Sequence, residues 1–437
     1  LRPSADVPPA GAPGSTNPVS VAALMDSVAM ALPPESSLKS EPYRAALRPE
    51  YISRPSIGYS QDNYGRGVYG GTTLVLGDML GNRQLAISGS LNGRLEEAQA
   101  FVAYQNSARR LNWAVGAIQQ PYFFLGNYTQ TPFGSNGVAL QSQTLERYVI
   151  RQAFGQSSYP LNRFDRFEIG AQFTSIDRAR MFLTQAVNSY GYGSGFYVDS
   201  VRGGGTLNYA SPYAAYVSDN ALNGRTGPMF GHRYRLELRP NLSGDSSWVN
   251  YTADVRRYDA ILFSFLTFAT RFYADVAVGK GELRYPKYIG LPYYVRGYDR
   301  ENYQSADCGT NGSNGRSNSA GSCSAIQLIG SRVAIANAEL RFPLIRRFDL
   351  GVLPISLPPL DGLLFYDAGV AWSGNQDVSL TQPQNYDFTR QRFPLRSFGY
   401  GLRLNLFNIA VLRWDYAYPR DGFSKKPYWV FSIGPSF

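Results

Sequence analysis

Hydrophobic and polar residues alternate along much of this chain, and residues 428–437 show the pattern most clearly. Large apolar side chains alternate there with small residues, most of them polar. The apolar set is Trp429, Phe431, Ile433 and Phe437. Successive side chains of a strand point to opposite faces of its sheet, so this segment predicts a β-strand with one apolar and one small polar face.

About sixteen such segments follow one another from residue 59 onward. The predicted strands are 68–80, 82–92, 95–106, 111–124, 143–155, 165–176, 178–188, 206–218, 230–242, 246–258, 261–278, 331–345, 361–372, 396–408, 409–418 and 428–437. Tight turns are expected near Asn92-Gly93 and Asp177-Arg178, and long loops at 189–205, 279–330 and 373–395. Three connections, at 125–142, 219–229 and 346–360, are too long for short turns at the other rim.

The two faces of these strands indicate a membrane protein. One face collects charges such as Arg271, Arg403 and Asp415, while the other carries aromatic residues near the strand ends. Aromatic girdles at the two membrane interfaces and a polar lumen explain this distribution. The chain has 32 Tyr, 25 Phe and 44 Gly, and it lacks a run of about 18 apolar residues that could form a membrane helix. We therefore predict an all-β fold, a transmembrane antiparallel β-barrel; a soluble β-rich surface protein is the alternative.

Residues 1–55 differ from the rest because they are rich in Pro and Ala and poor in aromatic residues. Apolar residues from Val21 to Leu32 fall at helical spacing, and Pro33-Pro34 ends the pattern. We predict a periplasmic linker with a short amphipathic helix at 1–55 and the barrel at 56–437. Because the sequence starts at Leu1 without a signal peptide, an upstream region is expected to be missing.

Candidate chemistry is sparse. The chain has one histidine, His232, and no metal-ligand cluster, phosphate-binding loop or nucleophile motif, so we expect no enzyme activity, cofactor or metal. Cys308 and Cys323 lie in a flexible polar stretch and could form a local disulfide in an oxidising compartment. The net charge of +10 is spread along the chain, and no dense basic cluster with aromatic residues predicts nucleic-acid binding.

Three segments around the longest loop carry the informative residues. The loop contains Tyr294-Val295-Arg296-Gly297-Tyr298, and the next two strands contain Glu339 and Phe365-Tyr366-Asp367. Alternation places Glu339, Phe365 and Asp367 on the inward faces of these strands. A loop folded into the lumen could therefore pair Arg296 with two carboxylates, and such a charge-assisted fork is directional and strong.

These residues resemble the BamA-type superfamily of outer-membrane assembly and secretion barrels, also called the bacterial surface antigen family. Its hallmark is a Val-Arg-Gly-Phe/Tyr tip on the sixth outer loop of a sixteen-stranded barrel, and Val295–Tyr298 falls between our eleventh and twelfth predicted strands. Glu339 matches the family's glutamate on strand twelve. Phe365, Asp367 and Gly369 match its Phe-x-Asp-x-Gly on strand thirteen, and Gly70-Gly71 resembles its opening strand.

The resemblance implies a bacterial outer-membrane protein that inserts or translocates proteins through a seam between its first and last strands. Gly70 and Gly71 on one side, and Gly434, Pro435 and Phe437 on the other, would form that seam; Pro435 cannot donate a ladder hydrogen bond. The expected partners are outer-membrane lipid, lipopolysaccharide and other outer-membrane or periplasmic proteins. The family's POTRA domains are absent from residues 1–55, which leaves client delivery in question.

Two other functions stay open at this stage. The barrel could be a structural anchor or binding subunit for an upstream domain or partner complex, which a sealed lumen would favour. It could also be a porin-like channel, which predicts steady conductance. The Arg296 contact itself could be a purely structural salt bridge or part of a switch.

Overall fold

A computed structural model shows the arrangement of the chain. It describes residues 43, 45–62, 65–135, 137–190, 193, 197–262, 265–298, 327–345, 348–350, 355–381, 390–406, 410–421 and 426–434. The chain divides into two compact units, residues 1–45 and 46–437. The helix predicted at residues 21–32 lies outside the described residues. No helix among the described residues is long and apolar enough to cross a membrane.

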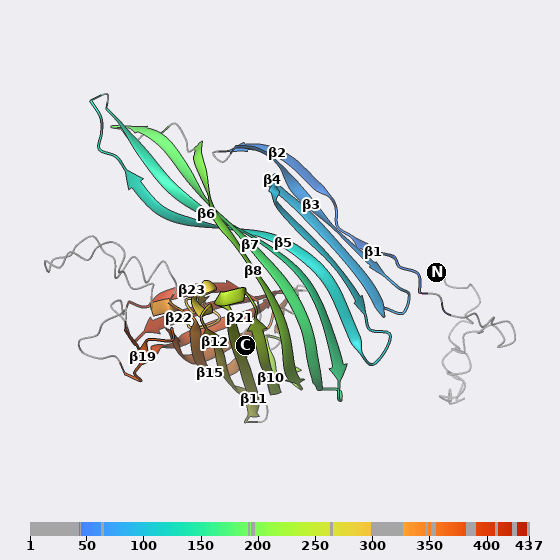
Figure 1. The fold of residues 1–437 in the computed structure, drawn as a ribbon. Coiled ribbons are helices and arrows are strands. Elements are labelled where there is room, and N and C mark those ends of the chain that lie inside the picture. The colour runs from blue at the N-terminus through green and yellow to red at the C-terminus, as the bar shows by residue number, and fades with distance from the viewer. Residues whose placement is uncertain are drawn as a thin grey trace, which may run out of the picture. The chain divides into compact units, whose positions relative to one another are not determined.

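The described part of residues 46–437 is built almost entirely of β-strands (Figure 1). One sheet contains β1 (Arg48–Ile52), β2 (Ser56–Asp62), β3 (Gly65–Gly77), β4 (Arg83–Asn106), β5 (Asn112–Gln130), β6 (Val138–Pro160), β7 (Asp165–Asn188), β8 (Tyr197–Asp219), β9 (Leu222–Asn223), β10 (Pro228–Asn241), β11 (Trp248–Ile261), β12 (Leu266–Gly279), β15 (Arg332–Ile345), β18 (Leu360–Trp372), β21 (Leu395–Leu406), β22 (Ala410–Pro419) and β23 (Tyr428–Ile433). Short pairs form outside it: β13 (Lys287–Tyr288) with β14 (Ile329–Gly330), β16 (Phe348–Leu350) with β17 (Ile355–Leu357), and β19 (Asp377–Val378) with β20 (Gln391–Arg392). Two 3-10 turns, η2 (Gly244–Ser246) and η3 (Glu282–Arg284), complete the set.

Neighbouring long strands pair antiparallel in chain order from β3 to β23, which agrees with the predicted all-β antiparallel fold. The first segment, β1 and β2, was missed by the sequence analysis and pairs with the other side of β3. The sheet therefore begins within the range predicted as a linker. One edge of the sheet is β1/β2 and the other is β23. Among the described residues no pairing joins these two edges, and the strand number stays a prediction.

The turn expected near Asn92-Gly93 lies within β4, and hydrogen bonds show that the chain reverses there. The amide of Ser107 donates to the carbonyl of Asn82 at 2.7 Å, and Ser90 Oγ lies 3.2 Å from Gln99 Oε1. In one extended strand, residues 82 and 107 would lie roughly 80 Å apart. The two arms of β4 consequently form a hairpin. This agrees with the prediction of two separate strands at 82–92 and 95–106.

The turn expected at Asp177-Arg178 is wrong. β7 continues through these residues and pairs with β6 along its whole length, from Arg166 opposite Pro160 to Asn188 opposite Val138. The local irregularity is a shift in register against β8 between Asp177 and Ala179. A strand of 24 residues is about 80 Å long, so β6 and β7 extend well beyond the ~30 Å hydrocarbon core.

The predicted alternation of faces is confirmed in the C-terminal half of the sheet. In β15, Glu339 and Arg341 are buried while Ala336 is exposed. In β18, Phe365 and Asp367 are buried while Leu364 and Tyr366 are exposed. Leu364 and Tyr366 thus lie on the outer face, whereas Phe365 and the charged residues of both strands point inward.

Candidate functional site: an arginine loop docked on the inward face

The segment between β12 and β15 returns to the sheet and docks on its inward face. Residues 294–298, which we call the arginine loop, contain side chains that are almost fully buried: Val295, Arg296 and Tyr298 expose 1–2% of their surfaces. Val295 and Tyr298 pack with Val333 and Ile335 of β15 in one apolar cluster. The loop is therefore held by an apolar contact around a charged centre.

Arg296 binds two carboxylates from adjacent strands. Its Nε and Nη2 donate to the two oxygens of Asp367 at 2.7 and 2.8 Å, and its Nη1 donates to Glu339 Oε1 at 2.9 Å. The backbone amide of Arg296 also donates to Asp367 Oδ2 at 3.1 Å. The structure thus brings together the three charged residues singled out in the sequence. A planar guanidinium suits this double contact better than the point charge of a lysine would.

The face of the Arg296 guanidinium lies on an aromatic ring. Its Cζ atom is 3.7 Å from the centroid of Phe365, which points inward beside Asp367. Arg296 Nη1 also lies 3.6 Å from Asp415 Oδ2 of β22. One loop residue therefore touches side chains from β15, β18 and β22.

Glu339 is the centre of a larger charge cluster. Its Oε2 accepts hydrogen bonds from Arg341 Nε at 2.8 Å and from Arg403 Nη2. Arg413 Nη2 bonds Asp415 Oδ2 at 3.1 Å. A buried charge is costly unless it is paired, and this cluster meets that requirement by sharing carboxylates among several arginines.

Two glycines make room for the arginine loop. A Cβ atom on Gly369 would lie 2.4 Å from Val295 Cγ2, so this glycine provides the notch that receives Val295. Gly297 has a φ of 90°, a left-handed conformation that favours glycine. A Cβ on Gly297 would also lie 3.4 Å from Pro419 Cγ, within ordinary contact distance. The positive φ explains the glycine at position 297, and the close approach of Val295 explains the glycine at position 369.

Tyr298 ties the arginine loop to the start of β21 and the end of β22. Its hydroxyl lies 2.6 Å from the carbonyl oxygen of Arg396, to which it donates. It accepts a hydrogen bond from the amide of Asp421 at 3.0 Å. The side chains of Arg396 and Asp421 form a bidentate pair at 2.8 and 2.7 Å. Tyr298 thereby holds two chain segments that lie about 100 residues beyond it.

Arg271 and Asn337 were not among the predicted site residues, yet they hold the loop as well. Arg271 Nη1 donates to the carbonyl of Tyr293 at 3.2 Å, and Asn337 Nδ2 donates to the carbonyl of Tyr294 at 2.8 Å. Both lie on alternate positions that face inward, which is the signal that could have identified them. Which loop atom each would meet depends on the path of the loop, which alternation does not specify.

The loop environment perturbs its titratable groups. Burial alone would lower the pKa of Arg296, but the negative charges of Asp367 and Glu339 outweigh it and raise the pKa above its usual value. Burial raises the pKa of Tyr294 to about 12. Arg296 therefore stays positively charged and Tyr294 stays neutral throughout the physiological range.

The remaining predicted residues lie elsewhere. Gly70 and Gly71 of β3 pair with Ile57 and Ser56, so they lie one strand inside the sheet edge and not on it. Gly434 still donates its amide to Val411 at 2.9 Å. Pro435, Phe437, Cys308 and Cys323 lie outside the described residues, so their roles stay predictions.

Comparison with known proteins gives a family match. Residues 141–437 match the model of the Omp85 superfamily domain. No curated protein matches the chain. Among solved structures, BamA from Haemophilus ducreyi lacking POTRA domains 1–3 is 15% identical, with a TM-score of 0.48, over 89% of this chain and 70% of that one. CdiB from Escherichia coli is 12% identical, with a TM-score of 0.44, over 90% of this chain and 67% of that one.

Proposed function

Because the chain belongs to the Omp85 superfamily and is an outer-membrane β-barrel, we propose that it inserts or translocates proteins at the outer membrane through a seam between its two sheet edges. Insertion and translocation of proteins is the role of such barrels at the level of the family. For this chain in particular, we propose that the client protein passes through the seam. Its partners would be outer-membrane or periplasmic proteins, and lipid or lipopolysaccharide would surround it.

The edge formed by β23 is the observation that supports a seam. β23 has six residues, whereas its neighbour β22 has ten and β21 has twelve. Among the described residues its ladder against β22 runs from Tyr428 to Ile433, and the amide of Gly434 adds one bond to the carbonyl of Val411. Fewer paired residues mean fewer hydrogen bonds to break when an edge separates or accepts a new strand. On the other side, β2 and not Gly70-Gly71 supplies the edge.

Crosslinking tests this proposal. Single cysteines introduced along β2 and β23, in a chain with both native cysteines replaced by serine, would be oxidised in pairs in outer-membrane vesicles. We expect that a crosslinked pair blocks insertion of a radiolabelled barrel substrate and that reduction restores it. Matched pairs between β21 and β22, such as Leu404 with Leu412, already face each other and should leave insertion unchanged. Full activity of a quantitatively crosslinked seam would contradict the proposal.

A structural anchor or binding subunit is the second candidate. The buried contacts of Arg296 favour it, because they fasten the arginine loop to the inward face of the strands that would line the lumen. It predicts no insertion activity, with or without crosslinks, and loss of a partner complex from the membrane when the barrel is removed. A porin-like channel would instead show steady conductance in planar bilayers. Our proposal includes no enzymatic step.

A further inference from the structure

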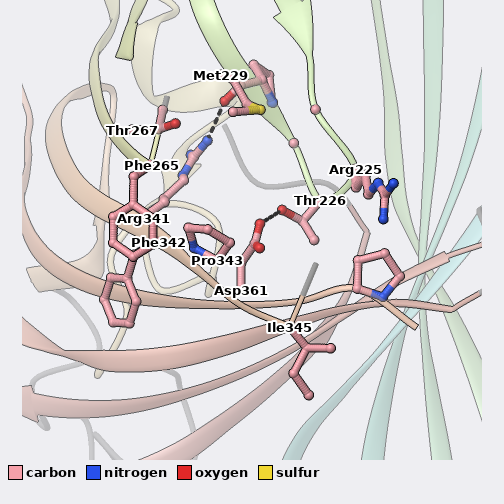
Figure 2. Close-up of a pocket in the computed structure, with 14 residues that line it drawn as sticks. Arg225, Thr226, Met229, Phe265, Thr267, Arg341, Phe342, Pro343, Ile345 and Asp361 are labelled. Atoms are coloured by element: carbon pink, nitrogen blue, oxygen red, sulfur yellow. Dashed lines mark hydrogen bonds between the residues drawn. The ribbon is translucent and has the colours of Figure 1, made fainter. Parts of the chain in front are cut away.

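The connection between β8 and β10 folds onto the inward face of the sheet, at the end opposite the arginine loop. Thr226 Oγ1 donates to Asp361 Oδ2, and Asn405 Nδ2 donates to the carbonyl of Arg225. Asp361 shares its alternate positions on β18 with Asp367, and Asn405 shares those on β21 with Arg403. Residues 224–228, which we call the inner turn, therefore lie against the inward-facing side chains, as Figure 2 shows for Thr226 and Asp361.

The inner turn is partly buried: Thr226 and Pro228 are buried, whereas Arg225 is exposed. Thr226 exposes 5% of its surface, and the amide of Gly224 donates to the carbonyl of Gly227 at 2.8 Å. Connections normally run over the surface, where water bonds their backbone groups. This one takes its partners from strands that lie far away in the sequence. That explains why the 219–229 connection is longer than a short turn.

A cavity of about 320 Å³ lies beside the inner turn. Met229, Phe265 and Ile345 are among its lining residues, together with Arg341 and Asp361 (Figure 2). Close-packed interiors leave few voids of this size. The cavity leaves one side of the inner turn without packed neighbours, so its polar contacts with the strands help to hold it in place.

Arg341 connects the inner turn to the arginine loop. Its Nη1 donates to the carbonyl of Pro228 at 3.0 Å, while its Nε donates to Glu339 Oε2 at 2.8 Å. The other oxygen of the same carboxylate accepts the hydrogen bond from Arg296 Nη1. Three consecutive contacts thus run from Pro228 through Arg341 and Glu339 to Arg296. Arg341 exposes 6% of its surface, so water has little access to these contacts.

We propose that Arg341 is a positioning residue that couples the inner turn to the arginine loop, so that release of either segment weakens the docking of the other. The guanidinium is a rigid plane, so a bond to Glu339 fixes the direction in which Nη1 points at Pro228. When Arg296 leaves, Glu339 loses one of its three arginine donors and can shift toward the other two, which changes the direction in which Arg341 points. The reverse holds when the inner turn leaves, because coupling between two sites is reciprocal. This coupling between the inner turn and the arginine loop does not require that the seam opens.

Hydrogen exchange of the full-length chain in lipid nanodiscs, followed by mass spectrometry, tests the coupling. Thr226→Val removes one contact of the inner turn and keeps the shape of the side chain. We expect exchange to rise about fivefold at residues 224–227, as loss of one ordinary hydrogen bond would give, and to rise measurably at 294–298 as well. Arg296→Ala should raise exchange at 224–227 in return. A rise confined to the mutated segment in both variants would overturn the proposal.

Two further variants separate coupling from general loosening. Arg341→Lys keeps the charge beside Glu339 but cannot bond both partners in one rigid plane. In the Arg341→Lys background, Thr226→Val should no longer affect 294–298. Arg239→Met removes an arginine that pairs with Glu237 on β10 and should leave both segments unchanged. If Arg239→Met also raised exchange at both segments, or if the effect of Thr226→Val persisted without Arg341, the link through Arg341 would be refuted. Exchange does not depend on transport, so failure of the proposed function would not mimic either outcome.

Discussion

Arg296→Ala should release the arginine loop while the barrel stays folded. The Arg296 side chain and both of its carboxylate partners expose at most about 2% of their surfaces, so water does not weaken these pairs. Removing one partner of a buried ion pair costs about 3–5 kcal/mol, because a charge is left behind without compensation. At about 1.4 kcal/mol per factor of ten, the undocked population should increase by a factor on the order of 10² to 10³.

The structure also shows which carboxylate carries this cost. Without Arg296, Glu339 keeps Arg341 and Arg403 as donors. Among the described side chains Asp367 then keeps the neutral Asn337, whose Nδ2 donates to Asp367 Oδ1 at 2.8 Å. The main penalty therefore falls on Asp367. Asp367→Asn in the Arg296→Ala background removes the isolated charge, so it should recover a substantial part of the docking energy. An Asp367→Asn change alone should instead weaken docking, because it takes a charge from Arg296.

Limited trypsin digestion in outer-membrane vesicles measures the undocked population. Lys287 provides a cleavage site that the docked state protects, because its side chain is only 13% exposed and Nζ donates to the carbonyl of Ser331. When opening and closing are fast relative to cleavage, the cleavage rate follows the equilibrium population of the open form. Heat-modifiability on gels reports whether the barrel is folded. Cleavage of Arg296→Ala within twofold of the wild-type rate, with a folded barrel, would refute the reasoning, and so would an absence of recovery in the double variant.

Three other substitutions test separate parts of the docked loop. Gly369→Ala should weaken docking by about 1–3 kcal/mol because its Cβ would overlap Val295, and the same digestion should detect it. Gly297→Ala should cost a similar amount, about 1–3 kcal/mol, because of its positive φ; an unchanged digestion rate would show that the loop adapts. Arg271→Ala should raise hydrogen exchange near Tyr293, since the Tyr293 carbonyl loses a charged donor, a bond worth about 1.5–3 kcal/mol, and exchange at β10 serves as the internal control.

The strand faces could be predicted from the sequence because alternation is a local property. Each side chain on β15 or β18 is assigned to a face by its own position in the strand, so Glu339, Phe365 and Asp367 were correctly placed inward. The contacts of these side chains across strands depend on register as well. Asn337 lies opposite Asp367, and Glu339 lies opposite Phe365. No local pattern specifies these pairs, which is why the contact of Glu339 with Arg403 was not foreseen.

The errors in the strand assignment have physical causes. Pro55 interrupts the first segment between β1 and β2, so its alternation is short and was not recognised. Asp177-Arg178 has the composition of a turn, but the structure accommodates it as an irregularity between β7 and β8. In the sequence, only the length of the 219–229 connection indicated that the inner turn is unusual. Its partners Asp361 and Asn405 lie more than 130 residues away, so no local pattern could identify them.

The charge cluster places the strongest contacts of the arginine loop in the same half of the sheet as the edge β23. Arg296 contacts residues of β15, β18 and β22, and β22 is the strand to which β23 is paired. A docked loop therefore adds contacts among β15, β18 and β22 to those made by their ladders and by bonds such as that of Arg403 with Glu339. When the loop is undocked, Asp415 of β22 keeps only Arg413 among the ion pairs described above. Release of the loop therefore removes one favourable charge contact from β22. Docking of the loop and pairing of the edge consequently share one strand, β22.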